Sequence, residues 1–279
     1  MIDDLIALSP LLVALAGAGL LAGLLAGLLG IGGGLILVPV LVLVFEFTDV
    51  AIEHRLHLAV ATSLATIIFT GASACRAHFK LGLVQVSLLK SWAPSIAIGA
   101  MCGGWLASRI SAFGLGIVFA SLAWLIALKM WMPARKQAAQ PSLERSVSHL
   151  PGRPWLDCAG FAIGTFAAMM GIGGATFSVP FMTMHQLPTR IAVATASGLG
   201  VIIAVPAMLA LGIGGLGQQN LPPFSLGYVN LLAVGFIIPF TMSAAPFGAR
   251  LAHHMNPLVL KRCFAIFLAF SGWWILRSS

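Results

Sequence analysis

Long apolar runs recur from one end of the chain to the other. The first, residues 5–45, holds no charged side chain over 41 residues, and further runs cover residues 58–74, 88–107, 112–132, 191–213, 225–247 and 258–276. A helix of about 20 apolar residues can cross the roughly 30 Å hydrocarbon core of a bilayer. The alternating segments of about ten residues that mark a membrane β-barrel are missing from the pattern. The chain is therefore predicted to be an all-α polytopic membrane protein.

The first run is too long for one straight span, because 41 helical residues would extend about 60 Å at 1.5 Å per residue. The chain is expected to turn back at the glycine cluster of residues 30–34, GIGGG. The related segment in the second half, residues 158–184, is shorter and suits two half-helices that meet inside the membrane as a re-entrant hairpin. Whether these hairpins cross the membrane fully is left open by the sequence.

The two glycine clusters belong to an internal repeat. Residues 19–39 read GLLAGLLAGLLGIGGGLILVP, and residues 160–180, at a fixed offset of 141, read GFAIGTFAAMMGIGGATFSVP. Two shorter motifs recur in the same order, AVATS with AVATAS and GGWLA with GARLA. Glycine-broken apolar segments at matching places in two halves are typical of secondary transporters. We predict two repeats, residues 1–132 and 155–279, each a glycine-broken helical hairpin followed by three transmembrane helices, joined by a linker at residues 133–154.

The positive charges indicate the orientation. The net charge of +8 does not point to nucleic acid, because the Lys and Arg residues lie between the spans. If each broken segment enters and leaves on one side, 12 of the 15 Lys and Arg share the linker side and Arg55, Arg109 and Arg277 lie opposite. If each broken segment crosses the membrane only once, the Lys and Arg residues are divided 9 to 6 between the two sides. The positive-inside rule favours the first arrangement, with a cytoplasmic linker, periplasmic termini and an inverted second repeat of five segments.

The glycine breaks predict an anion site near the membrane midplane. A helix that begins inside the membrane exposes unpaired N–H groups and the positive end of its dipole, and glycine lets a ligand approach the backbone closely. The predicted substrate-binding residues are Gly30, Gly32, Gly33, Gly34, Gly171, Gly173, Gly174, Thr62, Ser63, Thr195, Ser197 and Arg76. Pro39 and Pro180 are predicted to kink the second half-helices. For Gly19, Gly23, Gly160 and Gly164 we expect close helix packing instead.

Other chemistry finds little support in the sequence. No carboxylate lies deep in an apolar run, no P-loop GxxxxGK[ST] is present, and the four cysteines form no CxxC or Cys/His cluster. We therefore expect no enzymatic activity, no cofactor and no metal. His57, near the outer mouth, is a candidate carrier of a coupled proton, with a solvated loop histidine as the alternative.

These motifs resemble the TauE/SafE family of sulfite and organosulfonate permeases. The resemblance rests on GLLGIGGG…VP, its second copy MMGIGGA…VP, AVATS in the next span, and His78 followed by Gly82. It implies a bacterial inner-membrane transporter of sulfite, sulfoacetate or related sulfur-containing anions. One departure is Ala175, which stands where the first repeat has Gly34.

The predicted function is secondary transport of a small sulfur-containing oxyanion across the bacterial inner membrane. An uncoupled anion channel, or a membrane scaffold or assembly protein without a substrate, remain alternatives. The expected partners are the anion and the lipid bilayer, not nucleic acid. The sequence leaves open a homodimer, the direction of transport and the coupling ion.

Overall fold

Helices make up nearly all of the fold in the computed structural model, which describes residues 2–29, 34–48, 50–131, 152–252 and 257–278. The first half contains α1 (Ile2–Leu29), α2 (Gly34–Glu46), α3 (Ile52–Lys80), α4 (Val86–Arg109) and α5 (Ala112–Trp131). The second half contains α7 (Arg153–Met169), α8 (Ala175–Met184), α9 (Thr189–Gly214), β1 (Ser225–Leu226), β2 (Val229–Asn230), α10 (Leu231–Ala252) and α11 (Pro257–Arg277). The all-α prediction is confirmed.

Four of the described helices are long and apolar enough to cross a membrane: Ile52–Lys80, Ala112–Trp131, Thr189–Gly214 and Leu231–Gly248. The predicted run 225–247 begins six residues too early. Residues 225–230 form an antiparallel hairpin of β1 and β2 instead, because Phe224 and Gly227 adopt positive φ of 62° and 54° that a helix does not accommodate.

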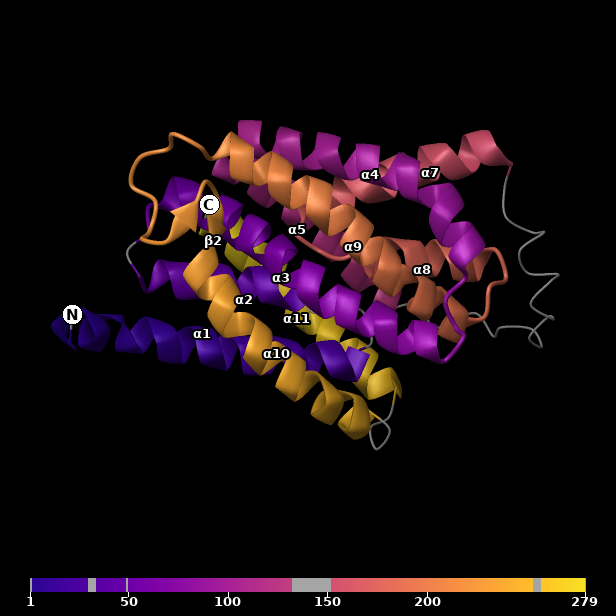
Figure 1. Ribbon diagram of the computed structural model, residues 1–279, viewed down its shortest axis with the longest axis horizontal. Helices are drawn as coiled ribbons and strands as arrows, with labels where there is room; N and C mark the ends of the chain where they lie inside the picture. Colours follow the sequence, from indigo (N-terminus) through magenta and orange to yellow (C-terminus); the bar gives the residue numbers. More distant parts are fainter. Residues whose placement is uncertain (1, 30–33, 49, 132–151, 253–256, 279) are drawn as a thin grey trace.

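The chain leaves and returns to the same end of the molecule twice. In Figure 1, α1 starts at the left end, where the C-terminus also lies, and α2 leads back towards that end. In the second half α7 starts at the right end and α8 leads back to the right. After each broken pair, three long helices pass through the bundle.

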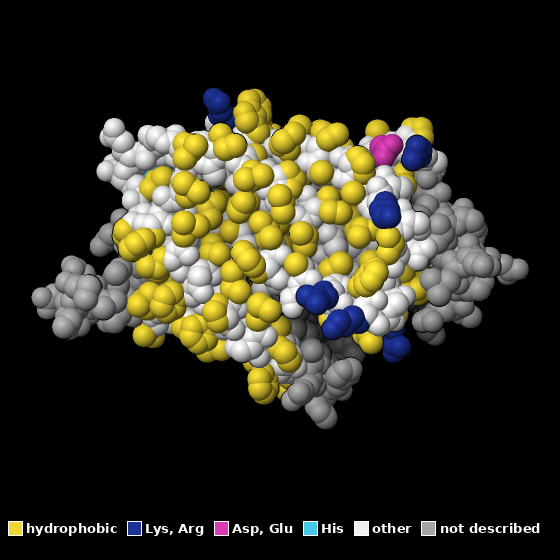
Figure 2. All heavy atoms as spheres, in the orientation of Figure 1, with side chains coloured by type: hydrophobic (Ala, Val, Ile, Leu, Met, Phe, Trp, Pro, Cys, Tyr) yellow, Lys and Arg dark blue, Asp and Glu magenta, His cyan; other side chains and the backbone are white. Residues whose placement is uncertain are grey.

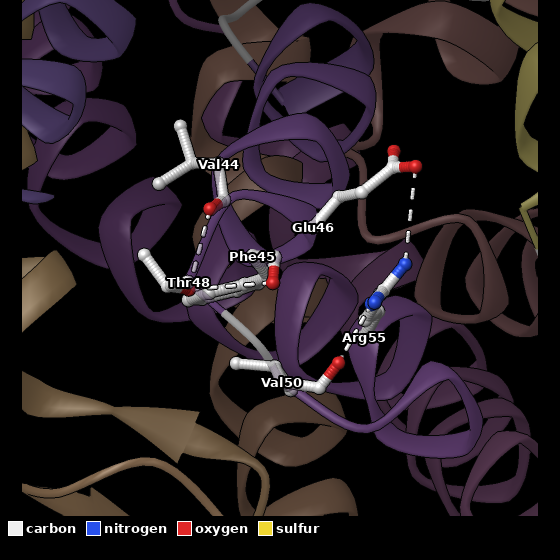
Figure 3. A network of polar contacts seen from close by, with 6 residues as sticks. All are labelled: Val44, Phe45, Glu46, Thr48, Val50 and Arg55. Atoms are coloured by element: carbon white, nitrogen blue, oxygen red, sulfur yellow. Dashed lines mark hydrogen bonds and ion pairs between the residues drawn. The ribbon is translucent and has the colours of Figure 1, made fainter.

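A polar corner joins α2 to α3 (Figure 3). Arg55 donates from Nε to the Val50 carbonyl at 2.7 Å, and its guanidinium lies 4.0 Å from the Glu46 carboxylate. Thr48 donates to carbonyls of the last turn of α2 at 3.3 Å. The Thr48 bonds reach carbonyls of the last turn of α2, where a helix leaves carbonyl groups without partners of its own.

The core is built around α3 and α9, which pack on each other and bury their middle turns. On one flank α1 packs on α10, and on the other α4 packs on α7. Glycine makes both contacts close. A Cβ on Gly19 would lie 3.0 Å from the Ile237 carbonyl, and one on Gly164 would overlap the Ile96 carbonyl. The packing role predicted for these glycines is confirmed.

The surface matches a protein surrounded by lipid. Figure 2 shows hydrophobic side chains across the middle of one face and most of that face's Lys and Arg in its right half. The course of the helices places at that end the described basic residues Arg76, Lys80, Lys90, Lys129, Arg153, Arg190 and Arg262.

Candidate functional site

The second glycine break is a helix ending followed at once by a new helix. After α7, the N–H of Ile172 donates to the Ala167 carbonyl at 3.0 Å and the N–H of Gly171 to the Ala168 carbonyl at 3.1 Å. This is the Schellman motif, whose left-handed residue is usually glycine, and Gly171 occupies that position with φ of 66°. Gly171 therefore ends α7, which leaves Gly173 and Gly174 to lead into α8.

The first turn of α8 is buried, and its N–H groups lack acceptors in their own helix. Its first helical bond runs from the Ser178 N–H to the Gly174 carbonyl at 2.8 Å, so the N–H groups of Ala175, Thr176 and Phe177 have no carbonyl of their own helix to bond. The Thr176 hydroxyl is buried and has no hydrogen-bond partner among the residues that the structure describes. Ser178, by contrast, donates its hydroxyl to the Gly174 carbonyl at 2.6 Å.

The start of α2 packs directly against this break. A Cβ on Gly34 would lie 2.9 Å from the Gly171 carbonyl oxygen and 3.0 Å from the Ile172 Cα. Across the break, Gly173 approaches Gly200 of α9. We call the region formed by Gly34, residues 171–176 and Gly200 the central site. Gly30, Gly32 and Gly33, predicted to belong to it, lie outside the described residues.

Two of the predicted hydroxyls form matching bonds that join the two halves. Thr62 of α3 accepts the N–H of Asn230, the residue before α10, at 3.1 Å. Thr195 of α9 accepts the N–H of Gln85, the residue before α4, at 3.0 Å. Both threonines are fully buried. Each hydroxyl still has a proton to donate, so their contact with an anion stays a prediction.

Ser63 and Ser197 use their protons on carbonyls. Ser63 donates to the Gly171 carbonyl at 2.8 Å, which ties α3 to the break. Ser197 donates to the Ala194 carbonyl of its own helix at 2.6 Å. A serine has one hydroxyl proton, so neither offers it to a ligand in this conformation.

The remaining predicted residues lie away from the central site or have no tested role. Arg76 is exposed near the end of α3, at the same end of the molecule as Arg153. Pro39 and Pro180 lie inside α2 and α8, and both helices continue past them. Their roles in attracting anions and in kinking the helices stay predictions.

Two surface hollows lie near the ends of the molecule. One, of about 520 Å³, is lined by Trp155, Cys158, Ala159, Phe181 and His185 of the α7–α8 arms. The other, of about 470 Å³, lies along the loop of residues 215–227, before α10. The central site is packed shut between these two ends, with residues 171–176 all buried.

Comparison with known proteins decides the family. The family model described as "Sulfite exporter TauE/SafE" matches residues 15–275. The chain belongs to this family. The TauE/SafE match covers both glycine breaks and the helices that follow them, as the resemblance of the motifs predicted.

Curated relatives of this TauE/SafE protein are described as probable membrane transporters. One from Haemophilus influenzae is 33% identical over 92% of this chain and 94% of its own. YunE of Bacillus subtilis is 25% identical over 93% of this chain and 95% of its own. A third, from Methanocaldococcus jannaschii, is 24% identical over 98% of this chain. No solved structure matches the chain significantly. The protein is a multi-pass membrane transporter.

Thr176 is the residue of this TauE/SafE protein that sequence reasoning missed. The search for hydroxyls followed motifs present in both halves, and Thr176 has no counterpart, because Leu35 stands 141 residues before it. One feature of the sequence pointed to Thr176. TFS follows the second glycine cluster where the first repeat has the wholly apolar LIL.

Proposed function

We propose that this TauE/SafE protein is a secondary transporter that carries sulfite, sulfoacetate or another small organosulfonate across the bacterial inner membrane. The observation that carries the proposal is the start of α8: N–H groups without a carbonyl partner in their own helix, the positive end of a helix dipole and the Thr176 hydroxyl, which has no hydrogen-bond partner among the described residues, lie together in the buried centre. These are donors, and an anion is the ligand that satisfies them.

The charges around the site support an anion over a cation. Among the described residues the buried polar side chains are His, Thr, Ser and Asn, with no Asp or Glu. A cation in the same place would face N–H groups and find no carboxylate to pair with. The name of the family model, sulfite exporter, supports a sulfur oxyanion as the cargo.

The contacts between the halves support two inverted repeats. In an inverted repeat, α1 of the first half corresponds to α7 of the second, and α4 corresponds to α10. The α1–α10 contact then has the α7–α4 contact as its counterpart, and both are extensive. The Thr62–Asn230 bond likewise has the Thr195–Gln85 bond as its counterpart. Such repeats place the substrate near the midplane and open to each side in turn. Alternating access distinguishes a carrier from a channel or a scaffold.

Replacing Thr176 with valine tests the site. Valine has nearly the same shape but no hydroxyl, so sulfite affinity should fall by about 1.5–3 kcal/mol, the range for hydrogen bonds to charged groups. The melting temperature without ligand should not fall, because the hydroxyl has no partner to lose in the described part of the chain. Calorimetry and thermal unfolding of purified protein measure the two quantities.

The matched control is Thr183→Val in the last turn of α8, whose hydroxyl donates to the Pro180 carbonyl at 3.1 Å. It should bind sulfite as the wild type does. Unchanged affinity in Thr176→Val would remove this residue from the site. Failure of every sulfur oxyanion to bind the wild type would reject the proposed cargo.

The orientation is tested by cysteine labelling in intact bacteria. We propose a cytoplasmic linker and periplasmic termini, because the linker end carries most of the Lys and Arg. In a background without the four native cysteines, Gln218→Cys in the loop before α10 should react with a membrane-impermeant maleimide. Lys80→Cys, at the end of α3, should react only after the cells are permeabilised. The reverse pattern would invert the proposed topology.

A further inference from the structure

His57 stands between two backbone carbonyls at the end of the molecule that holds the termini. Its Nδ1 lies 3.1 Å from the Glu53 carbonyl oxygen in the preceding turn of α3, and its Nε2 lies 3.1 Å from the carbonyl oxygen of Ile110, between α4 and α5. The side chain is only 3% exposed. The alternative of a solvated loop histidine is therefore wrong.

The protonation state of this ring decides how many of the two contacts are hydrogen bonds. A neutral imidazole carries one N–H and one lone pair, whereas an imidazolium donates from both nitrogens. Facing two carbonyl oxygens, the neutral ring makes one bond and sets a lone pair against the other oxygen. The charged ring bonds both oxygens and so ties α3 to the turn between α4 and α5.

Tyr228 of the β1–β2 hairpin packs against the ring of His57. Its ring stacks on His57 with centroids 4.9 Å apart and an interplanar angle of 25°. An aromatic face so close to an imidazolium stabilises the charge. Burial raises the pKa of the Tyr228 hydroxyl and the Glu53 carboxylate raises it further, so the phenol stays neutral when a histidine titrates.

The other titratable and charged groups nearby come from α2, α3 and α4. His54, also on α3, lies 5.9 Å from the Tyr228 ring, and its Nδ1 is buried without a partner. Arg55 is paired with Glu46 on α2, and Arg109 lies over the Trp105 ring at 5.6 Å.

We propose that His57 is a proton-binding latch between α3, the α4–α5 turn and the β1–β2 hairpin. A proton from the adjoining water binds the ring and closes this end of the molecule. Its return to water leaves a lone pair facing a carbonyl oxygen, breaks one bond and frees the α4–α5 turn to move. The latch operates whichever anion the protein carries.

A distance measurement at two pH values tests the latch. Spin labels at Ser111→Cys, in the α4–α5 turn, and at Gln218→Cys, beside the hairpin, report the separation of the two elements in the otherwise full-length protein without native cysteines. At pH 5.5 the distance should be single and narrow. At pH 8.5 a second, different distance should become the larger population, since an imidazolium loses its proton as the pH rises.

His57→Gln should make the distances independent of pH, because the side chain no longer titrates. The matched control, His54→Gln on the same helix, should keep the wild-type response. A response unchanged in His57→Gln would overturn the latch. Should that variant fail to fold, the wild type alone decides, because one pH-independent distance from pH 5.5 to 8.5 contradicts the proposal. None of these readouts requires transport, so they do not depend on the proposed cargo.

Discussion

Replacing Gly171 with alanine should cost the protein most of its folded yield. Gly171 adopts a φ of 66°, and a Cβ there would lie 2.8 Å from the Val60 Cα and 3.0 Å from the Val60 carbonyl oxygen. Left-handed backbone costs a residue with a Cβ about 1–2 kcal/mol, and forcing extra volume into a packed core typically costs about 1–3 kcal/mol. Because the opposing atoms belong to the backbone of α3, they cannot rotate away.

Fluorescence-detected size exclusion and thermal unfolding in detergent measure this loss. The control is Gly173→Ala, which makes the same Gly-to-Ala change two residues further along the chain. A Cβ there would lie 3.6 Å from the Ile67 Cγ2 and 3.9 Å from the Gly200 Cα, which are ordinary contacts. This variant should fold as the wild type does. A wild-type melting temperature in Gly171→Ala would contradict the role of Gly171 in ending α7.

The same Gly173→Ala variant should lower sulfite transport at least tenfold, although it folds. Gly173 leads into the first turn of α8, whose N–H groups have no carbonyl partner in their own helix, and its missing side chain lets an anion approach the backbone. A methyl group in that space forces the anion away from these donors. A tenfold loss of affinity corresponds to about 1.4 kcal/mol.

Initial rates of sulfite uptake in proteoliposomes, set against the amount of folded protein, measure the effect. Gly17→Ala in α1 is the matched control, because a Cβ there would meet no atom within 4 Å. It should transport as the wild type does. Wild-type rates in folded Gly173→Ala would mean that this glycine serves packing alone.

The sequence predicted the features that depend on local pattern. Glycine clusters at a fixed offset marked where α7 ends and where α2 and α8 begin, because left-handed backbone and close approach require glycine. The packing role of Gly19 and Gly164 followed from the same reasoning. The family was recognised from these motifs as well.

Features that depend on distant residues could not be predicted. The Thr176 hydroxyl is notable because no described residue forms a hydrogen bond with it, and only the packed structure reveals this. Ser63 uses its proton on Gly171, 108 positions away in the chain. His57 was assigned a coupled proton or a solvated loop, but its second carbonyl belongs to Ile110, 53 positions away. Tertiary contacts decided each case.

Counterflow in proteoliposomes tests most directly whether this protein carries a sulfur oxyanion through its central site. Vesicles loaded with unlabelled sulfite should take up radiolabelled sulfite transiently above equilibrium, with a saturable rate. Folded Thr176→Val and Gly173→Ala should lose most of this flux, and Thr183→Val should keep it. Large, linear flux without counterflow would indicate a channel. No sulfite flux, or full flux in both central-site variants, would contradict transport through the central site.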